Sequence, residues 1–431
     1  MQKVKHMAKR LKEDAQRDVP FDPLLTLRSE IAKDLGKAII ADIEVSEGRT
    51  RKRRANDQAT FEAQIHSLIA NAIRRHIEEP TGCVSITRKT SLLGQKSRYK
   101  TPVMSKRLPD VMDALVSHGW IVSTTGAWEG TFRQGLGKQS TFKASDQLIG
   151  RIESLGLRLP DIGHSDDKDC EVIILKPAHK SSKCRSKPME YGDTYTTIKY
   201  REQLQRINSW IADADISISD PVTKSMIDTQ QRRLRRVFNN GAFDQGGRLY
   251  GGFWIEMSKE ARQHIRINGN PVTILDYGQI GPRIMYGLAK VPPHFSDAYS
   301  IPGFDPKERK GVKTVFNAML CAEKGLKGFP PDAKELFKKG RKGKDVISAI
   351  REYHKPVVSV FDEGRGLNVN FHESEIMLSV LDRLMGLNIV GLPIHDAIIV
   401  EKANAETVSV IMVDAFKSVF GQDIPVTADD V

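Results

Sequence analysis

The sequence predicts a mixed α+β protein with more than one domain. With 431 residues, 39% of them hydrophobic and 28% charged, the chain is long enough to bury two or three hydrophobic cores. Apolar residues recur at helical spacing in several segments, and short apolar strands bounded by polar turns lie between these segments. In the second half, two such strands flank one turn, so we expect antiparallel sheet there.

The composition argues against membrane and secreted proteins. No stretch approaches the roughly 20 apolar residues that a bilayer span requires. The start, Met1–Lys12, is positively charged but is not followed by an apolar region. We therefore expect no membrane partner and a cytoplasmic protein, associated with the nucleoid if the source is bacterial. Four cysteines lie far apart without a C-x-x-C pair, which argues against a disulfide framework and a zinc site: Cys83, Cys170, Cys184 and Cys321.

The charge balance indicates a polyanionic partner. Lys and Arg number 66 against 54 Asp and Glu, a net charge of +12. In residues 51–150 and again in residues 301–350, basic side chains are about twice as frequent as acidic ones. Two basic regions predict two surfaces for nucleic acid, since neutralising phosphates releases counterions. A basic, solvated surface without a partner remains the alternative.

Residues 1–59 read as a charged, partly helical lead-in that contains the basic run Arg51–Arg54 near its end. From Thr60 a helix is predicted to end near Glu79, because its apolar residues recur every three or four positions. These residues are Phe61, Ile65, Leu68, Ile69, Ala72 and Ile73.

A DNA-binding module is predicted over residues 60–158. After the first helix come a short strand, Cys83–Ile86, an amphipathic helix over Ser105–Gly119, a strand from Trp120 and a glycine-rich hairpin reaching Ala144. This order resembles a winged helix-turn-helix module, whose last helix enters the major groove. Some winged modules contact proteins instead. The residues expected on phosphates or in the minor groove are Lys106, Arg107, Arg133, Lys138 and Lys143.

Residues 159–200 are polar and rich in Lys and Ser apart from the apolar run Val172–Leu175, and we expect an inter-domain linker there. Residues 201–431 would form the second domain.

Two carboxylates of the second domain are expected to converge. The apolar strand Val272–Asp276 ends in a carboxylate, and the apolar segments Asn388–Ile394 and Ala397–Val400 flank the pair His395-Asp396. Such a hairpin places Asp396 at its tip. Two carboxylates on neighbouring strands suit a pair of divalent ions that clamp the attacking and leaving oxygens of a phosphoryl transfer.

A cationic helix face lies between these two strands in the sequence. Arg309, Lys313 and Asn317 are spaced four apart within Lys307–Cys321, which places them on one face. A bidentate Arg and a monodentate Lys suit the neutralisation of a triphosphate.

In this order the motifs resemble those of family A DNA polymerases and the related single-subunit RNA polymerases. Asp276–Met285 reads D-Y-G-Q-I-G-P-R-I-M against the family's D-Y-S-Q-I-E-L-R. Arg309-x-x-x-Lys313 matches its R-x-x-x-K helix, Ile394–Ala397 matches its V-H-D-E, and Gly247–Tyr250 resembles its G-R-L-S segment. The resemblance covers about residues 230–431 and implies a right-hand palm with an antiparallel sheet and helical fingers. Nothing before it resembles the family's proofreading exonuclease.

The resemblance also implies residue roles. Asp276, Asp396 and the Tyr277 carbonyl would hold two Mg²⁺ ions. Arg309 and Lys313 would bind the incoming triphosphate beside Gly281 and Asn317, and Lys313 would protonate the leaving pyrophosphate. The catalytic residues would then be Asp276, Asp396 and Lys313. Contacts to primer and template would come from Arg248, His395, Gln279 and Arg283, and from the helix Asn370–Leu387 with His372 and Glu375.

Three departures separate this chain from the DNA polymerase branch. Gly281 replaces a glutamate that crowds the sugar 2′ position, and Ala397 replaces the glutamate after the last Asp. Asn317 and Cys321 replace aromatic residues that lie against the incoming base and the template. Base stacking would therefore be weaker or would come from another residue such as Phe316.

We expect a compact, DNA-directed DNA polymerase without proofreading, which uses primer-template DNA and nucleoside triphosphates. Only Tyr191–Thr223 precedes the palm as a possible thumb, which predicts low processivity. An accessory replication protein is a possible partner. A primase-like or single-subunit RNA polymerase is the first alternative, favoured by Gly281 and Ala397. A DNA-binding replication initiator or regulator without catalysis is the second.

Overall fold

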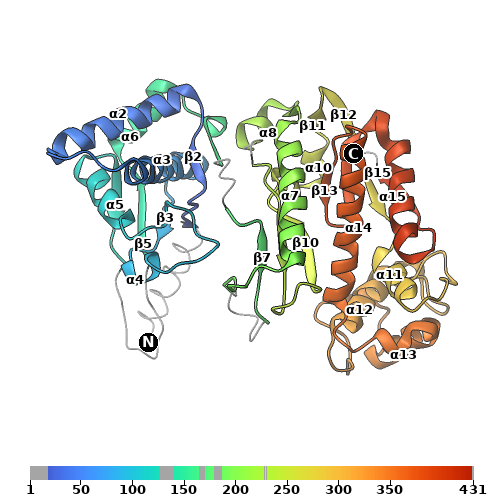
Figure 1. Ribbon diagram of the computed structural model, residues 1–431. Coiled ribbons are helices and arrows are strands. Elements are labelled where there is room, and N and C mark those ends of the chain that lie inside the picture. Colours follow the sequence, from blue (N-terminus) through green and yellow to red (C-terminus); the bar gives the residue numbers. More distant parts are fainter. Residues whose placement is uncertain are drawn as a thin grey trace, which may run out of the picture. The chain divides into compact units, whose positions relative to one another are not determined.

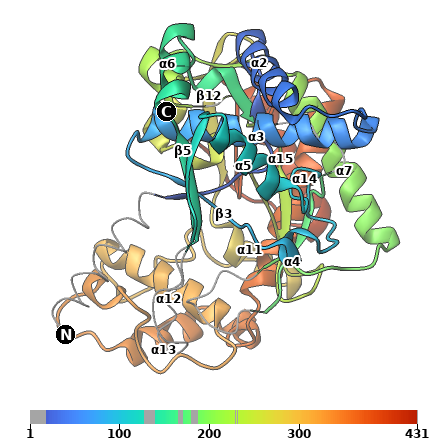
Figure 2. The same cartoon turned by 90° about the vertical axis from the view of Figure 1, so that its left-hand side faces the viewer.

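The chain divides into two compact units in the computed structural model, and both contain helices and sheet (Figures 1 and 2). This confirms the mixed α+β class. The first unit holds the chain up to Glu171 together with Ile218–Gln231, and the second holds Val172–Ser217 and Arg232–Val431. Across the described ranges, none of the helices combines the length and apolar content required to cross a bilayer. The structure describes residues 18–126, 139–164, 170–178, 187–227, 229 and 231–429.

The first unit packs helices against a small sheet whose strand order is β1-β3-β5-β4, with β2 and β6 paired separately. Strands β4 and β5, which flank residues 127–138 in the sequence, pair antiparallel. The strands are β1 (Val19–Pro20), β2 (Leu25–Leu27), β3 (Val84–Ile86), β4 (Ile121–Thr124), β5 (Ser140–Ala144) and β6 (Ile162–His164). The helices are α2 (Glu30–Glu47), α3 (Ala55–Glu78), α4 (Thr90–Leu93), α5 (Leu108–Ser117), α6 (Asp146–Leu155), α8 (Pro221–Met226) and the 3-10 turn η1 (Leu159–Asp161).

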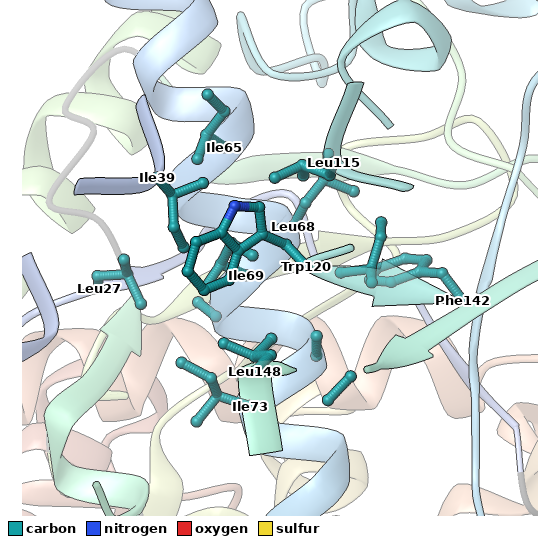
Figure 3. Packing of buried hydrophobic residues seen from close by; sticks show 14 of the residues in the cluster. Leu27, Ile39, Ile65, Leu68, Ile69, Ile73, Leu115, Trp120, Phe142 and Leu148 are labelled. Atoms are coloured by element: carbon teal, nitrogen blue, oxygen red, sulfur yellow. The ribbon is translucent and has the colours of Figure 1, made fainter. Parts of the chain in front are cut away.

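One hydrophobic core joins these elements. The buried side chains of α3, including Ile65 and Ile69, lie among Ile39 of α2, Trp120 and Phe142 (Figure 3). Residues 30–47, expected within a charged lead-in, are thus an integral helix of the unit. The reason is that Leu35, Ile39 and Ile43 of α2 recur every four residues and are buried.

The second unit is built around a sheet of order β13-β14-β12-β11-β8, with β15 also paired to β12, and a three-stranded sheet of order β10-β9-β7. The strands are β7 (Ile173–Leu175), β8 (Ile216–Ile218), β9 (Arg235–Phe238), β10 (Gly246–Tyr250), β11 (Ile265–Ile267), β12 (Asn270–Tyr277), β13 (Leu392–Ile394), β14 (Ala397–Glu401) and β15 (Val426–Asp429). The helices are α7 (Tyr195–Asp213), α9 (Phe253–Glu256), α10 (Lys259–Arg262), α11 (Ile280–Leu288), α12 (Arg309–Cys321), α13 (Gly343–Tyr353), α14 (Gly366–Gly386) and α15 (Ala405–Phe420). The 3-10 turns are η2 (Pro306–Glu308), η3 (Lys334–Leu336), η4 (Lys355–Val360) and η5 (Lys402–Asn404).

One strand of the second unit lies where the sequence predicted an inter-domain linker. The apolar run expected inside that linker forms β7, which pairs in parallel with β9 and so belongs to this unit.

The helices of the second unit pack in pairs and against the sheet. Helix α14 lies against α15 and β10, and α12 lies against α13 (Figures 1 and 2). The buried Trp254 of α9 donates its indole N–H to the Pro393 carbonyl at 2.9 Å, which fixes the β13–β14 hairpin.

Candidate active site

The β13–β14 hairpin brings the two predicted carboxylates to neighbouring strands. Ile394 pairs with Ala397, so His395 and Asp396 form a two-residue turn, and His395 has a φ of 55°. On the next strand, Asp276 pairs with Ala397, and the Tyr277 N–H donates to the Asp396 carbonyl at 3.2 Å. The two strand ends are therefore neighbours in the sheet, and both aspartates remain partly exposed.

Tyr277 supports this junction from the core. Its ring is buried, and its hydroxyl donates to the Met412 carbonyl of α15 at 2.6 Å. Burial raises the pKa of Tyr277 above its ordinary value. The side chain is therefore structural, and the backbone carbonyl is the group of Tyr277 that could bind a metal ion.

The donor set at the junction suits Mg²⁺. Magnesium binds through one or two carboxylates together with substrate phosphates, and it retains several waters. Asp276 and Asp396 supply two such carboxylates. Within the described part of the chain, no group of three or more His, Cys, Asp or Glu side chains gathers as a closed protein site.

A third carboxylate, which the motifs did not reveal, lies close by. Glu373 of α14 is only 3% exposed and accepts hydrogen bonds from Arg248 of β10 at 2.7 and 2.8 Å. Burial acts to lower the pKa of Arg248, but pairing with Glu373 outweighs it and raises the pKa. Burial raises the pKa of Glu373, the Arg248 guanidinium opposes that rise, and the charge of Asp396 adds to it. Arg248, Glu373 and Asp396 thus form one electrostatic cluster.

His395 occupies the tip of the hairpin beside this cluster. Its ring packs edge-on against Tyr250, with the centroids 5.6 Å apart. Burial lowers its pKa, and the nearby Arg248 lowers it further. Its Nδ1 is buried without a hydrogen-bond partner. The ring is therefore neutral near pH 7 and retains a polar atom that a bound group can contact.

The cationic face of α12 is present as predicted. Arg309, Lys313 and Asn317 are exposed, whereas Val312 and Phe316 of the same helix are buried. The guanidinium of Arg309 donates to Asp297 at 2.5 and 3.1 Å. The buried Tyr299 ring lies below both cations, 5.4 Å from the Arg309 guanidinium carbon and 5.9 Å from Lys313 Nζ.

Tyr299 also connects this face to the carboxylate junction. Burial raises its pKa, and the charges of Asp297 and Asp396 add to the rise while Arg309 opposes it. Asp396 and Arg309 therefore both act on one ring. Both predicted carboxylates and both predicted cations thus belong to the second unit.

Phe316, which the sequence left open as one source of base stacking, is not accessible to a base. Phe316 is fully buried, and its ring lies 5.1 to 5.6 Å from the rings of His354, Phe361 and Tyr299. Its neighbour Asn317 is exposed because successive helical residues differ in direction by about 100°. Cys321 contributes an exposed thiol that lies against Gly366, where an added Cβ would be 2.5 Å from its sulfur.

Gln279 and Arg283 both bind the backbone of one neighbouring segment. Gln279, with a φ of 60°, accepts the Ala298 N–H at 2.6 Å and donates to the Ser296 carbonyl at 3.4 Å. Arg283 is buried, which lowers its pKa, and it donates to the Ser296 carbonyl at 3.5 Å and to the Gly278 carbonyl at 3.2 Å. Gly281 lies between them beside open space, since an added Cβ would meet only Val369, at 4.0 Å.

No family model and no curated protein matches the chain. Among solved structures, the chain is similar to the POL domain of Pol1 from M. smegmatis in complex with DNA primer-template and dNTP. The identity is 14% and the TM-score is 0.29. The similarity covers 86% of this chain and 65% of that one, so the match spans just under two thirds of that domain's length.

The two α14 residues singled out as template contacts are engaged within the protein. Glu375 forms an ion pair with Arg236, a fully buried residue of β9 that also donates to the Ser374 hydroxyl at 3.1 Å. The His372 ring packs against Phe420 of α15, and burial lowers the pKa of His372. Both side chains hold α14 against its neighbours.

Three of the five residues predicted to contact DNA lie within the described part of the first unit. Lys106 and Arg107 are exposed just before α5, and Lys143 is exposed on β5. Arg133 and Lys138 lie outside the described residues. The exposed face of α5 itself carries Asp110 and Asp113, and Asp113 pairs with Arg88 at 2.6 Å. The cations therefore lie at the N-terminal end of α5 and not along its length.

Proposed function

We propose that this protein is a template-directed nucleotidyltransferase, and specifically a DNA-directed DNA polymerase that extends a primer 3′ hydroxyl without proofreading. The observation that carries this proposal is the register of β12 with β14, which sets Asp276 beside the Asp396 turn. A binding scaffold has no need for the cationic face of Arg309 and Lys313 in the same unit. Nucleotidyl transfer from a triphosphate uses both kinds of group. The carboxylates hold the metal ions at the reacting phosphate, and the cations neutralise the pyrophosphate that leaves.

The residues have complementary roles in this proposal. Asp276, Asp396 and the Tyr277 carbonyl hold Mg²⁺, which when bound lowers the energy of charge developing on the attacking and leaving oxygens. Arg309 and Lys313 neutralise the triphosphate, and Lys313 delivers a proton to the departing pyrophosphate. These roles require both cations to remain charged at neutral pH.

Arg248, Glu373 and His395 are proposed to place the primer end. Arg248 reaches the primer end, held in place by both oxygens of the buried Glu373. His395, neutral and with a free buried Nδ1, lies next to it.

The first unit is proposed to bind DNA as a winged-helix domain. Helix α3, strand β3, helices α4 and α5 and the antiparallel pair β4–β5 follow the order of such a module. Lys106, Arg107 and Lys143 offer cations to phosphates. Because α5 exposes Asp110 and Asp113, we expect DNA contact through the start of α5 and the β4–β5 hairpin.

An RNA polymerase or primase is the second candidate. The open space beside Gly281 leaves nothing from this residue against a sugar 2′ hydroxyl. Ala397, paired with Asp276, supplies no carboxylate beside Asp396.

Primer extension with Mg²⁺ on a short DNA template tests these candidates, run with dNTPs, with NTPs and without primer. We expect dNTP-dependent extension that Asp396→Asn abolishes while DNA affinity stays within about twofold. Asp423→Asn, which removes an exposed carboxylate that pairs with Lys417 at 3.0 Å, is the matched control and should retain activity. Synthesis from NTPs without primer would favour the second candidate. Silence of the wild type in every lane would favour a DNA-binding initiator or regulator.

A further inference from the structure

The segment Ser296–Ser300 between α11 and α12 is fastened at its centre from two sides. Ala298 donates its N–H to Gln279 at 2.6 Å, and its carbonyl accepts from His354 Nε2 at 2.9 Å. Gln279 lies two residues after the end of β12, so the segment is tied to that strand end. His354 is fully buried, so this attachment is protected from water.

Asp297 projects from this segment toward α12. Its carboxylate accepts two hydrogen bonds from Arg309, one from the Ser300 hydroxyl at 2.8 Å and one from the Tyr299 N–H at 3.0 Å. Burial acts to raise the pKa of Asp297, but these hydrogen bonds outweigh it and lower the pKa. The carboxylate is therefore ionised at neutral pH and has one defined orientation.

The Arg309 guanidinium is consequently held from two directions. Asp297 binds its Nε and one Nη, and the Tyr299 ring lies 5.4 Å from its central carbon. A guanidinium has five N–H donors, so three remain after the two bonds to Asp297. The side chain is still 44% exposed, and those donors are accessible from solvent.

We propose that Asp297 is a positioning residue that orients Arg309 to receive the triphosphate, and that the segment Ser296–Ser300 sets this orientation relative to the Asp276 strand. The inference rests on the proposed function and extends it to a residue outside the motifs. The positioning role and a purely electrostatic role of Asp297 predict opposite changes in triphosphate affinity when Asp297 is removed. If Asp297 acted only through its charge, its removal would make α12 more positive and tighten triphosphate binding. If it positions Arg309, its removal weakens binding.

The test is steady-state single-nucleotide incorporation by the full chain carrying Asp297→Asn, which keeps the size of the side chain and one acceptor oxygen. We expect the KM for the nucleotide to rise about tenfold with kcat changed less than threefold, since a charge-assisted bidentate contact is replaced by a neutral one. Arg309→Lys, which cannot form the fork, should raise KM similarly. In the double variant the two effects should not multiply, because both remove the same interaction.

Asp423→Asn serves as the control for removing a carboxylate from the second unit, and thermal unfolding shows whether each variant is folded. An unchanged or lower KM in Asp297→Asn overturns the inference, as do multiplying effects in the double variant. If the wild type incorporates no nucleotide, the proposed function fails, and equilibrium binding of a fluorescent nucleoside triphosphate with Mg²⁺ replaces the kinetic readout. Weaker binding by Asp297→Asn would then still support the positioning role, and equal binding or none by either protein would refute it.

Discussion

At the scale of single residues, Gly281 is informative because the fold does not require a glycine there. It lies in the first turn of α11, and a Cβ added to it would meet only Val369, at 4.0 Å. A Cβ therefore fits at this position without moving its neighbours. A carboxylate in the first turn of a helix also interacts favourably with the helix dipole.

We predict that Gly281→Glu raises the preference for dNTPs over NTPs by at least tenfold while stability is unchanged or rises by about 0.5 kcal/mol. The reason is that the new side chain occupies the space open to a 2′ hydroxyl. The ratio of kcat/KM values for matched dNTP and NTP substrates measures this. Gly281→Ala, which stiffens the helix without filling the space, should leave the ratio close to that of the wild type. If Gly281→Glu does the same, sugar selection resides elsewhere.

At the scale of secondary-structure elements, His354 joins the end of α13 to the segment before α12. It is fully buried, its Nε2 donates to Ala298, and its Nδ1 lies 3.1 Å from the Tyr286 hydroxyl. Burial lowers its pKa to about 4. The folded protein therefore favours neutral His354, whereas the unfolded chain binds a proton near pH 6.5.

It follows that stability falls as the pH drops from 6.5 toward 4, by on the order of 3 kcal/mol for this group when the decrease is complete. We predict that His354→Gln, which keeps a donor and an acceptor but cannot be charged, flattens this decrease. Thermal unfolding between pH 7 and pH 5 tests it, because the carboxylates with lowered pKa values, such as Glu308 at about 2, lose their contribution only at lower pH. His264→Gln, at a partly exposed position, is the control. Equal pH dependence of the wild type and His354→Gln would contradict the prediction.

The elements that the sequence predicted are those specified by local patterns. Helix α12 and the β13–β14 hairpin follow from apolar spacing and turn chemistry, and the same spacing places Phe316 inside with Val312. Helix α2 carried an equally regular pattern beneath its charges. Asp297 and Glu373 had no local signal, because their partners Arg309 and Arg248 lie 12 and 125 positions away. Only tertiary packing identifies such pairs.

At the scale of the whole molecule, the excess positive charge is displayed on defined parts of both units. In the first unit Lys106 and Arg107 are exposed before α5. In the second, Lys339 and Lys342 are exposed on the loop after η3. That loop is held to the start of α12 by a salt bridge between Arg341 and the buried Glu308, with an N–O distance of 2.8 Å. The backbone that carries its lysines is therefore anchored, which reduces the conformational entropy lost when a polyanion binds.

This placement makes the salt dependence of DNA binding a test of where the phosphates lie. Each phosphate contact contributes about 0.7 to 0.9 to the slope of log K against log salt concentration. We predict that Lys339→Gln with Lys342→Gln, and separately Lys106→Gln with Arg107→Gln, each reduce the slope by between one and two, and that the reductions add when combined. Fluorescence anisotropy with primer-template DNA at several salt concentrations provides the slopes.

The control is Lys402→Gln with Lys417→Gln, which removes the same charge from exposed positions of the second unit. If net charge alone attracts DNA, all three pairs weaken binding equally, because a diffuse field does not depend on position. If phosphates contact the two basic regions, the control pair leaves the slope unchanged while the other two reduce it. If only Lys106→Gln with Arg107→Gln reduces the slope, DNA contacts the first unit only, and the lysines after η3 form a solvated surface.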